Sequence, residues 1–215
     1  MNKEKIKQSQ HYLFIFKIAI SDEQAICFTN EVEKRREDIM KLMGFANDVI
    51  NCKPVYIIDQ SKDKNYIHGT GNRSSIQIYV NNLNDIYENV NLAIHEETHF
   101  ILSMLCPKIS SFLNEGIAEY VCWKYTNREK PAEFMQNFRH IRSVTCDMIL
   151  SRDNWMKAYQ KNGIWIYGVA CLYIEILLEN RYTIKELLQE IYTNNNIDII
   201  KSGLVESVKL GESKA

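Results

Sequence analysis

The chain has no surplus of either charge and no long apolar run. Its 215 residues include 26 Lys or Arg and 27 Asp or Glu, which leaves a net charge of −1. Proteins that bind nucleic acid or an anionic membrane surface usually carry an excess of basic residues. No stretch approaches the roughly 20 apolar residues of a transmembrane helix. We therefore expect no nucleic-acid partner and no membrane partner.

The chain also lacks a Cys-x-x-Cys pair, although it has six cysteines. Several of them stand in apolar helical patterns, so buried thiols in a reducing cytoplasm are the predicted state. The even count leaves disulfides open. The first 20 residues are basic and then apolar, loosely like a secretion signal, but Lys17 interrupts the apolar run and no cleavage site follows. We predict a cytoplasmic protein, with secretion as the alternative.

Strand patterns come first along the chain, and helical patterns follow. Aromatic and β-branched residues predict strands over 12–20, 54–59 and 75–80. The segment SKDKNYIHGTGNRSS before the third strand is interpreted as a polar turn region. A long amphipathic helix is expected from Ser21 or Asp22 to about residue 44. Its charged run EKRRED, residues 33–38, is interpreted as a solvated face.

From about residue 85 the pattern is helical almost to the end. One helix stops before Pro107, because proline cannot continue it, and another begins at Ser110 or Ser111. Further helices are expected near 131–150, 164–180 and 183–193, with a short one after them. The order of elements indicates an α+β fold. We predict a single domain over 1–215, with an α/β lobe over about 10–107 and a helical lobe over about 108–212.

The sequence LAIHEETHFIL, residues 92–102, contains the pattern His-Glu-x-x-His. Residues four apart on a helix differ by about 40° in direction and about 6 Å in height, so His95 and His99 can reach one ion. Glu96 lies about 100° around the helix, where it can take a proton from a water molecule held by that ion. A catalytic zinc site has three protein ligands and one open position. The alternative is a pair of ordinary histidines beside a solvated glutamate.

A second segment, FLNEGIAEY at residues 112–120, offers the third ligand. Glu115 and Glu119 are four apart and share one helix face. Gly116 has no side chain, which lets two helices approach closely. Glu115 can then complete a His-His-Glu site, and Glu119 can accept a hydrogen bond from a ligand imidazole. A solvated carboxylate is the alternative role for Glu119.

HEETH followed by FLNEGIAEY resembles the gluzincin metallopeptidases, the thermolysin-like and aminopeptidase-like superfamily, and especially its small peptidase MA-like bacterial members. Their typical second motif is W-L-N-E-G-x-A-x-Y, and Phe112 replaces its tryptophan here. The resemblance implies a zincin-like fold with a small N-terminal sheet and a mainly helical C-terminal lobe. It also implies Zn²⁺ held by His95, His99 and Glu115, with Glu96 as the general base.

One departure from the family pattern affects the predicted reaction. No G-x-M-x-N segment precedes the helix, so an endopeptidase is favoured over an aminopeptidase. The family also implies a donor to the reacting carbonyl oxygen, for which Tyr167 is the candidate. Under strict Y-x-x-G spacing Trp165 takes that position, and Tyr159 and His140 are further candidates. Aromatic core packing is the alternative for such rings.

The resemblance further implies that the strand at 74–80 is a sheet edge where an extended peptide pairs. The predicted function is a zinc-dependent metallopeptidase that acts on a peptide or protein. Two alternatives are a non-catalytic zincin-like module that binds a metal or peptide, and a metal-dependent hydrolase or sensor acting on a non-peptide bond. Glu96 argues against a purely structural metal, because such a site has no use for a base. Oligomeric state is left open.

Overall fold

The computed structural model describes residues 4–62, 67–126, 152–162, 165–180 and 182–194. The backbone divides into two compact units, an N-terminal unit over Met1–Met104 and a C-terminal unit over Leu105–Ala215. The helices expected near 131–150 and at the end of the chain lie outside the described residues, as does His140. Among the described helices, none combines the length and the apolar character needed to cross a lipid bilayer.

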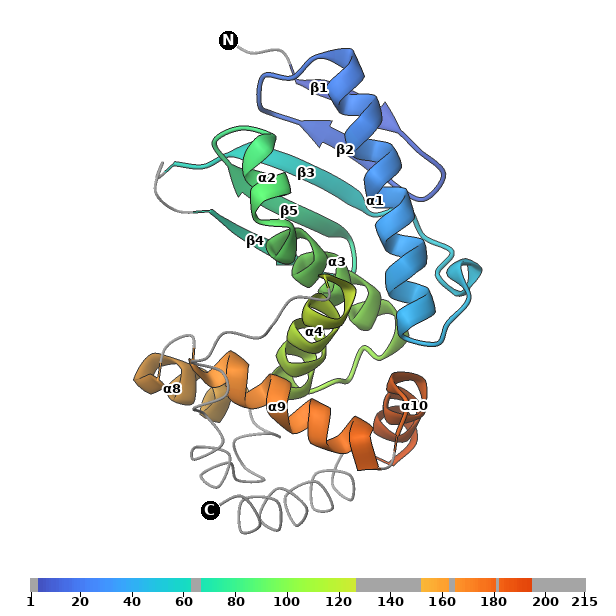
Figure 1. Cartoon of the computed structure of the whole chain (residues 1–215), viewed down its shortest axis with the longest axis vertical. Coiled ribbons are helices and arrows are strands. Elements are labelled where there is room, and N and C mark those ends of the chain that lie inside the picture. Colours follow the sequence, from blue (N-terminus) through green and yellow to red (C-terminus); the bar gives the residue numbers. More distant parts are fainter. Residues whose placement is uncertain (1–3, 63–66, 127–151, 163–164, 181, 195–215) are drawn as a thin grey trace. The chain divides into compact units, whose positions relative to one another are not determined.

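The N-terminal unit is built on a five-stranded mixed sheet (Figure 1). Its strands are β1 (Lys5–Gln8), β2 (Leu13–Phe16), β3 (Val55–Gln60), β4 (His68–Gly71) and β5 (Ser75–Val80). They lie in the order β1-β2-β3-β5-β4. The inner strands β2, β3 and β5 are parallel, and β1 and β4 pair with their neighbours in the antiparallel direction. The strand β5 is therefore an inner strand, and β4 is an edge.

One face of the sheet carries the core of the unit. Along β2, β3 and β5, buried and half-buried side chains alternate, as expected for a sheet covered on one side. The helices α1 (Asp22–Leu42), α2 (Asn84–Glu88) and α3 (Val90–Leu105) lie on one side of the sheet in Figure 1. Aromatic rings fill much of this layer, with Phe14 stacked on Tyr56 at 5.3 Å between ring centroids.

The long helix α1 begins and ends at residues whose chemistry explains its bounds. The Ser21 side chain accepts a hydrogen bond from the Gln24 amide, and the Gln24 side chain accepts one from the Ser21 amide. This reciprocal capping satisfies two backbone donors at the start of a helix. Shortly after the helix ends, Gly44 has φ of 81°, a left-handed conformation that glycine adopts without a steric cost.

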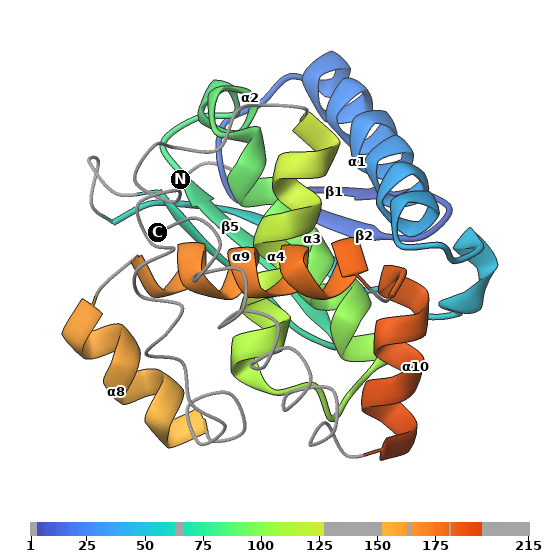
Figure 2. The same ribbon diagram turned by 60° about the horizontal axis from the view of Figure 1, so that its bottom comes forward.

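The described part of the C-terminal unit is helical. Its helices are α4 (Ser111–Thr126), α8 (Arg152–Asn162), α9 (Trp165–Asn180) and α10 (Ile184–Asn194). Figure 2 shows α9 crossing α4. The two helices meet at Gly116, where an added Cβ would lie 2.5 Å from the Ala170 carbonyl oxygen. The approach of the two backbones therefore requires a residue without a side chain at position 116.

The predicted α+β class is confirmed, and so are the three expected strands and the helix beginning after Ser21. The first expected strand, over 12–20, is shorter in the structure, and β1 was not expected. The region interpreted as a polar turn contains the strand β4. The prediction that 74–80 forms the sheet edge is wrong, because β5 pairs with β3 on one side and β4 on the other.

Candidate metal centre

The two histidines of the His-Glu-x-x-His pattern project from one face of α3. Their Nε2 atoms lie 2.9 Å apart, and their rings are perpendicular with centroids 4.5 Å apart. Two zinc–nitrogen bonds of 2.0–2.1 Å at a tetrahedral angle place the nitrogens about 3.3 Å apart. The two Nε2 atoms would therefore need to move apart by only about 0.4 Å to bind a shared zinc ion. Helix periodicity alone predicted this convergence, and the structure agrees.

Much of the face of α3 that carries the two histidines is shielded from solvent. The side chains of Glu96 and His99 are 6% and 7% exposed, and His95 is half-buried. The neighbouring Thr98 is fully buried and donates its hydroxyl to the Ile94 carbonyl oxygen at 2.7 Å. A shielded imidazole or carboxylate interacts more strongly with a nearby charge than an exposed one does. The burial therefore favours a specific partner for these groups.

Three side chains of metal-binding type form a group in the described residues. The ligand atoms of His95, His99 and Glu115 all lie within 4.8 Å of one another. Two imidazoles and a carboxylate are a donor set of the catalytic zinc type. The residues that the motifs single out therefore fit the predicted zinc, which itself stays a prediction. Glu119 stands one turn further along α4 and is half-buried, and its predicted hydrogen bond to an imidazole also stays a prediction.

Glu97, the second glutamate of the motif, has protein partners of its own. Its carboxylate accepts hydrogen bonds from Arg35 Nη2 at 2.9 Å and from Arg35 Nε at 3.2 Å. The Tyr56 hydroxyl donates a further bond at 2.9 Å, and burial together with the Glu97 charge holds the pKa of Tyr56 well above its usual 10.0. Arg35 stands on α1 and Tyr56 on β3, so this network fixes α3 against both elements.

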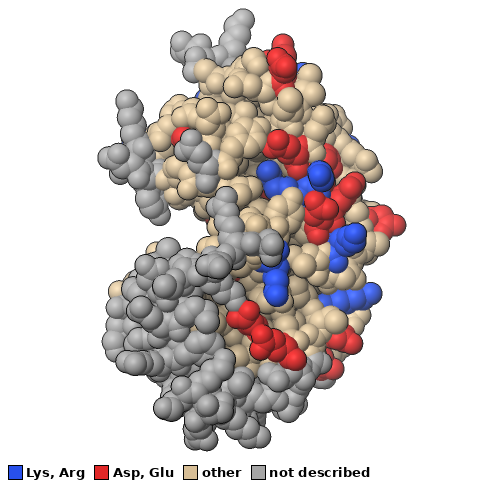
Figure 3. All heavy atoms as spheres, in the orientation of Figure 1, with Lys and Arg blue, Asp and Glu red and all other residues tan. Residues whose placement is uncertain are grey.

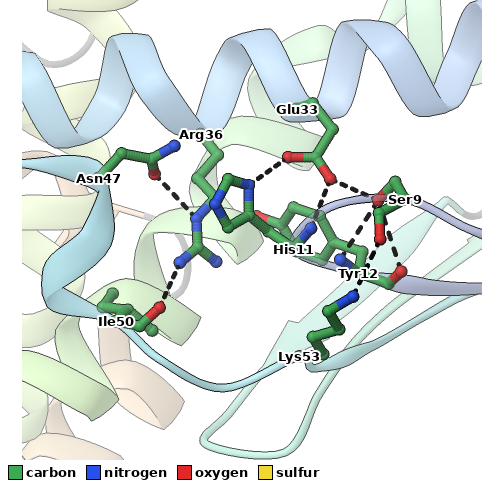
Figure 4. A network of polar contacts seen from close by, with 8 residues as sticks. All are labelled: Ser9, His11, Tyr12, Glu33, Arg36, Asn47, Ile50 and Lys53. Atoms are coloured by element: carbon green, nitrogen blue, oxygen red, sulfur yellow. Dashed lines mark hydrogen bonds and ion pairs between the residues drawn. The ribbon is translucent and has the colours of Figure 1, made fainter.

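The interpretation of the EKRRED run as a solvated face is wrong for its arginines. Arg35 is 5% exposed and Arg36 is fully buried. The Arg36 guanidinium donates to Asn47 Oδ1 and to the Ile50 carbonyl oxygen, both at 3.0 Å (Figure 4). A signal was present in the sequence, because both arginines lie three or four positions after Val32 and share its buried face.

On the face drawn in Figure 3, acidic and basic side chains of the described residues interleave, and neither sign forms a separate patch. Among the described residues, two ion pairs join opposite charges at the surface. Lys5 Nζ lies 3.1 Å from Asp22 Oδ1, and Lys17 Nζ lies 3.3 Å from Asp59 Oδ2. This distribution follows from the near balance of charge in the sequence.

The candidate donor to the reacting oxygen lies in an aromatic cluster of the C-terminal unit. The Tyr167 ring is half-buried and packs edge-on against Trp155 and Tyr159, with centroids 5.6 and 5.7 Å apart. Tyr159, a further candidate, thus contacts Tyr167 directly. Phe112 is buried and packs against Trp155 and Tyr173. The cluster accounts for the packing of Tyr167, and its catalytic role stays a prediction.

Gly116 does allow a close approach of two helices, but the helix pair differs from the predicted one. We expected this glycine to admit the close approach of the two motif-bearing helices. The structure places Gly116 against Ala170 and Ile174 of α9, so the helix that it admits is α9. An added Cβ would meet the Ala170 carbonyl oxygen at 2.5 Å and the Ile174 side chain at 2.8 Å.

The described cysteines match the predicted buried thiols in part. Cys106, Cys122 and Cys171 are buried, whereas Cys27 is exposed and Cys52 is half-buried. Burial raises the pKa of the Cys106 thiol above its ordinary value, which disfavours the thiolate needed in a nucleophile. The sixth residue, Cys146, lies outside the described residues.

Comparison with known proteins gives a likeness in structure only. No family model and no curated protein sequence matches the chain. The crystal structure of an aminopeptidase N family protein from Idiomarina loihiensis is similar, with a TM-score of 0.51 and 14% sequence identity. The match covers 90% of this chain and 41% of that protein, so this chain spans less than half of the neighbour's length. At this identity the likeness shows a shared fold.

Proposed function

We propose that the protein is a zinc-dependent peptidase and that it cleaves within peptide chains. The observation that carries the proposal is the grouping of His95, His99 and Glu115 within 4.8 Å, with Glu96 next to the first ligand on the same helix. The fold shared with an aminopeptidase N family protein lends weaker support. The alternative of a non-catalytic metal- or peptide-binding module predicts the same grouping but gives Glu96 no task.

Each residue of the site has a separate role in this proposal. His95, His99 and Glu115 would hold the zinc, and a bound zinc ion supplies Lewis-acid polarisation of a peptide carbonyl and acidifies water. A Glu96 carboxylate oxygen accepts the proton of the attacking water and returns it to the leaving amine. Glu119 orients an imidazole through a hydrogen bond. Tyr167 donates its hydroxyl to the carbonyl oxygen as negative charge develops there.

The proposed substrate binds in an extended conformation along β4. In the described sheet β4 has a strand neighbour on one side only, and its glycines bring its backbone beside Glu96. An extended peptide can add to such an edge through main-chain hydrogen bonds. This placement replaces β5, which the sequence suggested for that task and which lies inside the sheet.

The test begins with metal analysis of the purified full chain. We expect one zinc per chain, and we expect it to be lost in His95→Ala and in Glu115→Ala. Cleavage of a mixed peptide library is then compared between wild type and Glu96→Gln. Loss of a general base lowers turnover by about 10²–10⁴-fold, whereas the zinc content should stay unchanged.

Glu179→Gln is the matched control, because it makes the same Glu-to-Gln change at an exposed position on α9. It should cleave like wild type. Equal cleavage by wild type and Glu96→Gln would refute the proposed mechanism. Zinc binding without cleavage by any variant, across a library that includes folded proteins, would favour the non-catalytic module.

A further inference from the structure

The edge strand β4 places two glycines against the helix that carries Glu96. Gly69 and Gly71 are two apart, so both point to the same face of the sheet. A Cβ built on either residue would meet atoms of α3. The residue between them, Thr70, is exposed, and the His68 ring stacks on Tyr79 of β5 with centroids 4.3 Å apart. The glycine pattern of β4 therefore belongs to its contact with α3.

The two glycines meet different parts of α3. A Cβ on Gly71 would lie 2.0 Å from the Glu96 carbonyl oxygen and 3.0 Å from the His99 Cβ. The helix backbone cannot yield by that much, so Gly71 sets the distance between strand and helix. A Cβ on Gly69 would instead lie 2.6 Å from Cγ and 3.1 Å from Cδ of the Glu96 side chain. Gly69 thus borders the carboxylate arm and not the helix backbone.

We propose that Gly69 is a positioning residue for Glu96. The Glu96 side chain is 6% exposed, and it occupies the space that any side chain at position 69 would need. Because Gly69 has no side chain, the β4 backbone packs directly against the Cγ and Cδ atoms of Glu96. This packing limits the rotamers available to the Glu96 side chain. The inference rests on the proposed function, because it assigns the position of the base in that same site.

The consequence for turnover follows from the size of the displacement. Relieving a 2.6 Å approach between carbon atoms to an ordinary contact requires a shift of about 1 Å. A misplacement of about 1 Å in a reacting group can lower the rate about 100-fold. In the zinc-loaded full chain, Gly69→Ala should therefore lower kcat about 100-fold and leave KM and zinc content unchanged. Glu179→Gln, whose side chain is exposed on α9, should cleave like wild type.

A second readout does not depend on activity. Urea unfolding of the full chain, with and without added zinc, is compared for Gly69→Ala in the wild-type and Glu96→Ala backgrounds. If the new methyl group meets the Glu96 side chain, Gly69→Ala destabilises the wild type much more than the Glu96→Ala background, where the Ile78 Cδ1 atom at 3.0 Å is the remaining close neighbour. We expect a coupling of at least about fivefold in the unfolding equilibrium. Gly71→Ala should destabilise both backgrounds alike, because it meets the helix backbone.

Three outcomes would overturn the proposal. They are equal destabilisation by Gly69→Ala in both backgrounds, loss of zinc from Gly69→Ala, and a crystal structure of Gly69→Ala in which Glu96 keeps its wild-type position. If Gly69→Ala is too unstable to purify, the Gly69→Ala/Glu96→Ala double variant must restore folding, and failure to do so also counts against it. Absence of cleavage by wild type refutes the proposed function alone, since the unfolding comparison still decides the role of Gly69.

Discussion

Removing the positive charge of Arg35 should destabilise the N-terminal unit strongly. Arg35→Met keeps most of the side-chain length but leaves the Glu97 carboxylate, which is fully buried, without its cation. Two donor atoms of Arg35, Nε and Nη2, lie 2.9–3.2 Å from the carboxylate oxygens. Breaking a buried ion pair on one side costs about 3–5 kcal/mol. For a chain of this length that corresponds to a fall in Tm of roughly 6–20 °C.

The size of the effect depends on the charge that is left behind, and two further variants separate the contributions. Tyr56→Phe removes one hydrogen bond to the charged Glu97 and should cost about 1.5–3 kcal/mol. The double variant Arg35→Met/Glu97→Leu removes both charges and should recover most of the loss, because an apolar pair of similar volume is often neutral in a core. High salt should change these values little, since the pair is shielded from solvent.

The assay is urea and thermal unfolding followed by far-ultraviolet circular dichroism. Lys34→Met is the matched control, because Lys34 is the exposed neighbour of Arg35 on α1. A surface change of this kind is usually within about 0.5 kcal/mol of wild type. The reasoning fails if Arg35→Met is as stable as Lys34→Met, or if the double variant is no more stable than Arg35→Met alone.

Two other predictions concern packing and pH. Gly116→Ala should lower the stability of the C-terminal unit by about 1–3 kcal/mol in urea unfolding, because the new Cβ would lie 2.5 Å from the Ala170 carbonyl oxygen. This steric cost should outweigh the better helix propensity of alanine. A stability equal to that of wild type would contradict the close approach of α4 and α9. Burial by itself raises the pKa of Glu33, but hydrogen bonds from Ser9 and His11 outweigh it and hold this pKa below 4.5 (Figure 4). A carboxyl group whose pKa is lowered in the folded state stabilises the fold at pH values above its ordinary pKa, and this contribution is lost as pH falls below about 4.5. The free energy of unfolding should therefore change less between about pH 6 and about pH 3 in Glu33→Gln than in wild type. Equal pH dependence in the two proteins would show that Glu33 does not contribute to it.

Features that depend on short-range spacing were predicted well from the sequence. The four-residue interval between His95 and His99 placed both imidazoles on one helix face, and their Nε2 atoms lie 2.9 Å apart. The start of α1 was predicted at Ser21 or Asp22, and the structure places the cap at Ser21, which exchanges hydrogen bonds with Gln24 three positions later. Such features follow from helix geometry over one or two turns, whatever the rest of the chain does.

Features that depend on distant partners were missed. Arg35 and Arg36 stand in a charge run, and only the structure shows that Glu97, Asn47 and Ile50 are the partners that satisfy them in the core. The counter-charge of Glu97 likewise lies 62 positions earlier in the chain, at Arg35. Local charge patterns do not contain this information, because the pairing is set by how α1 and α3 pack on the sheet.

The sequence by itself determined which side chains have metal-binding chemistry, and it placed His95, Glu96 and His99 correctly around one helix. Only the tertiary structure decided that the glycine-rich segment after residue 67 is an edge strand, with Gly69 against the Glu96 side chain. The physical reason is the range of the interactions. Helix periodicity acts over a few residues. The neighbours of a glycine in a strand depend instead on strand pairing and on how helices pack on the sheet.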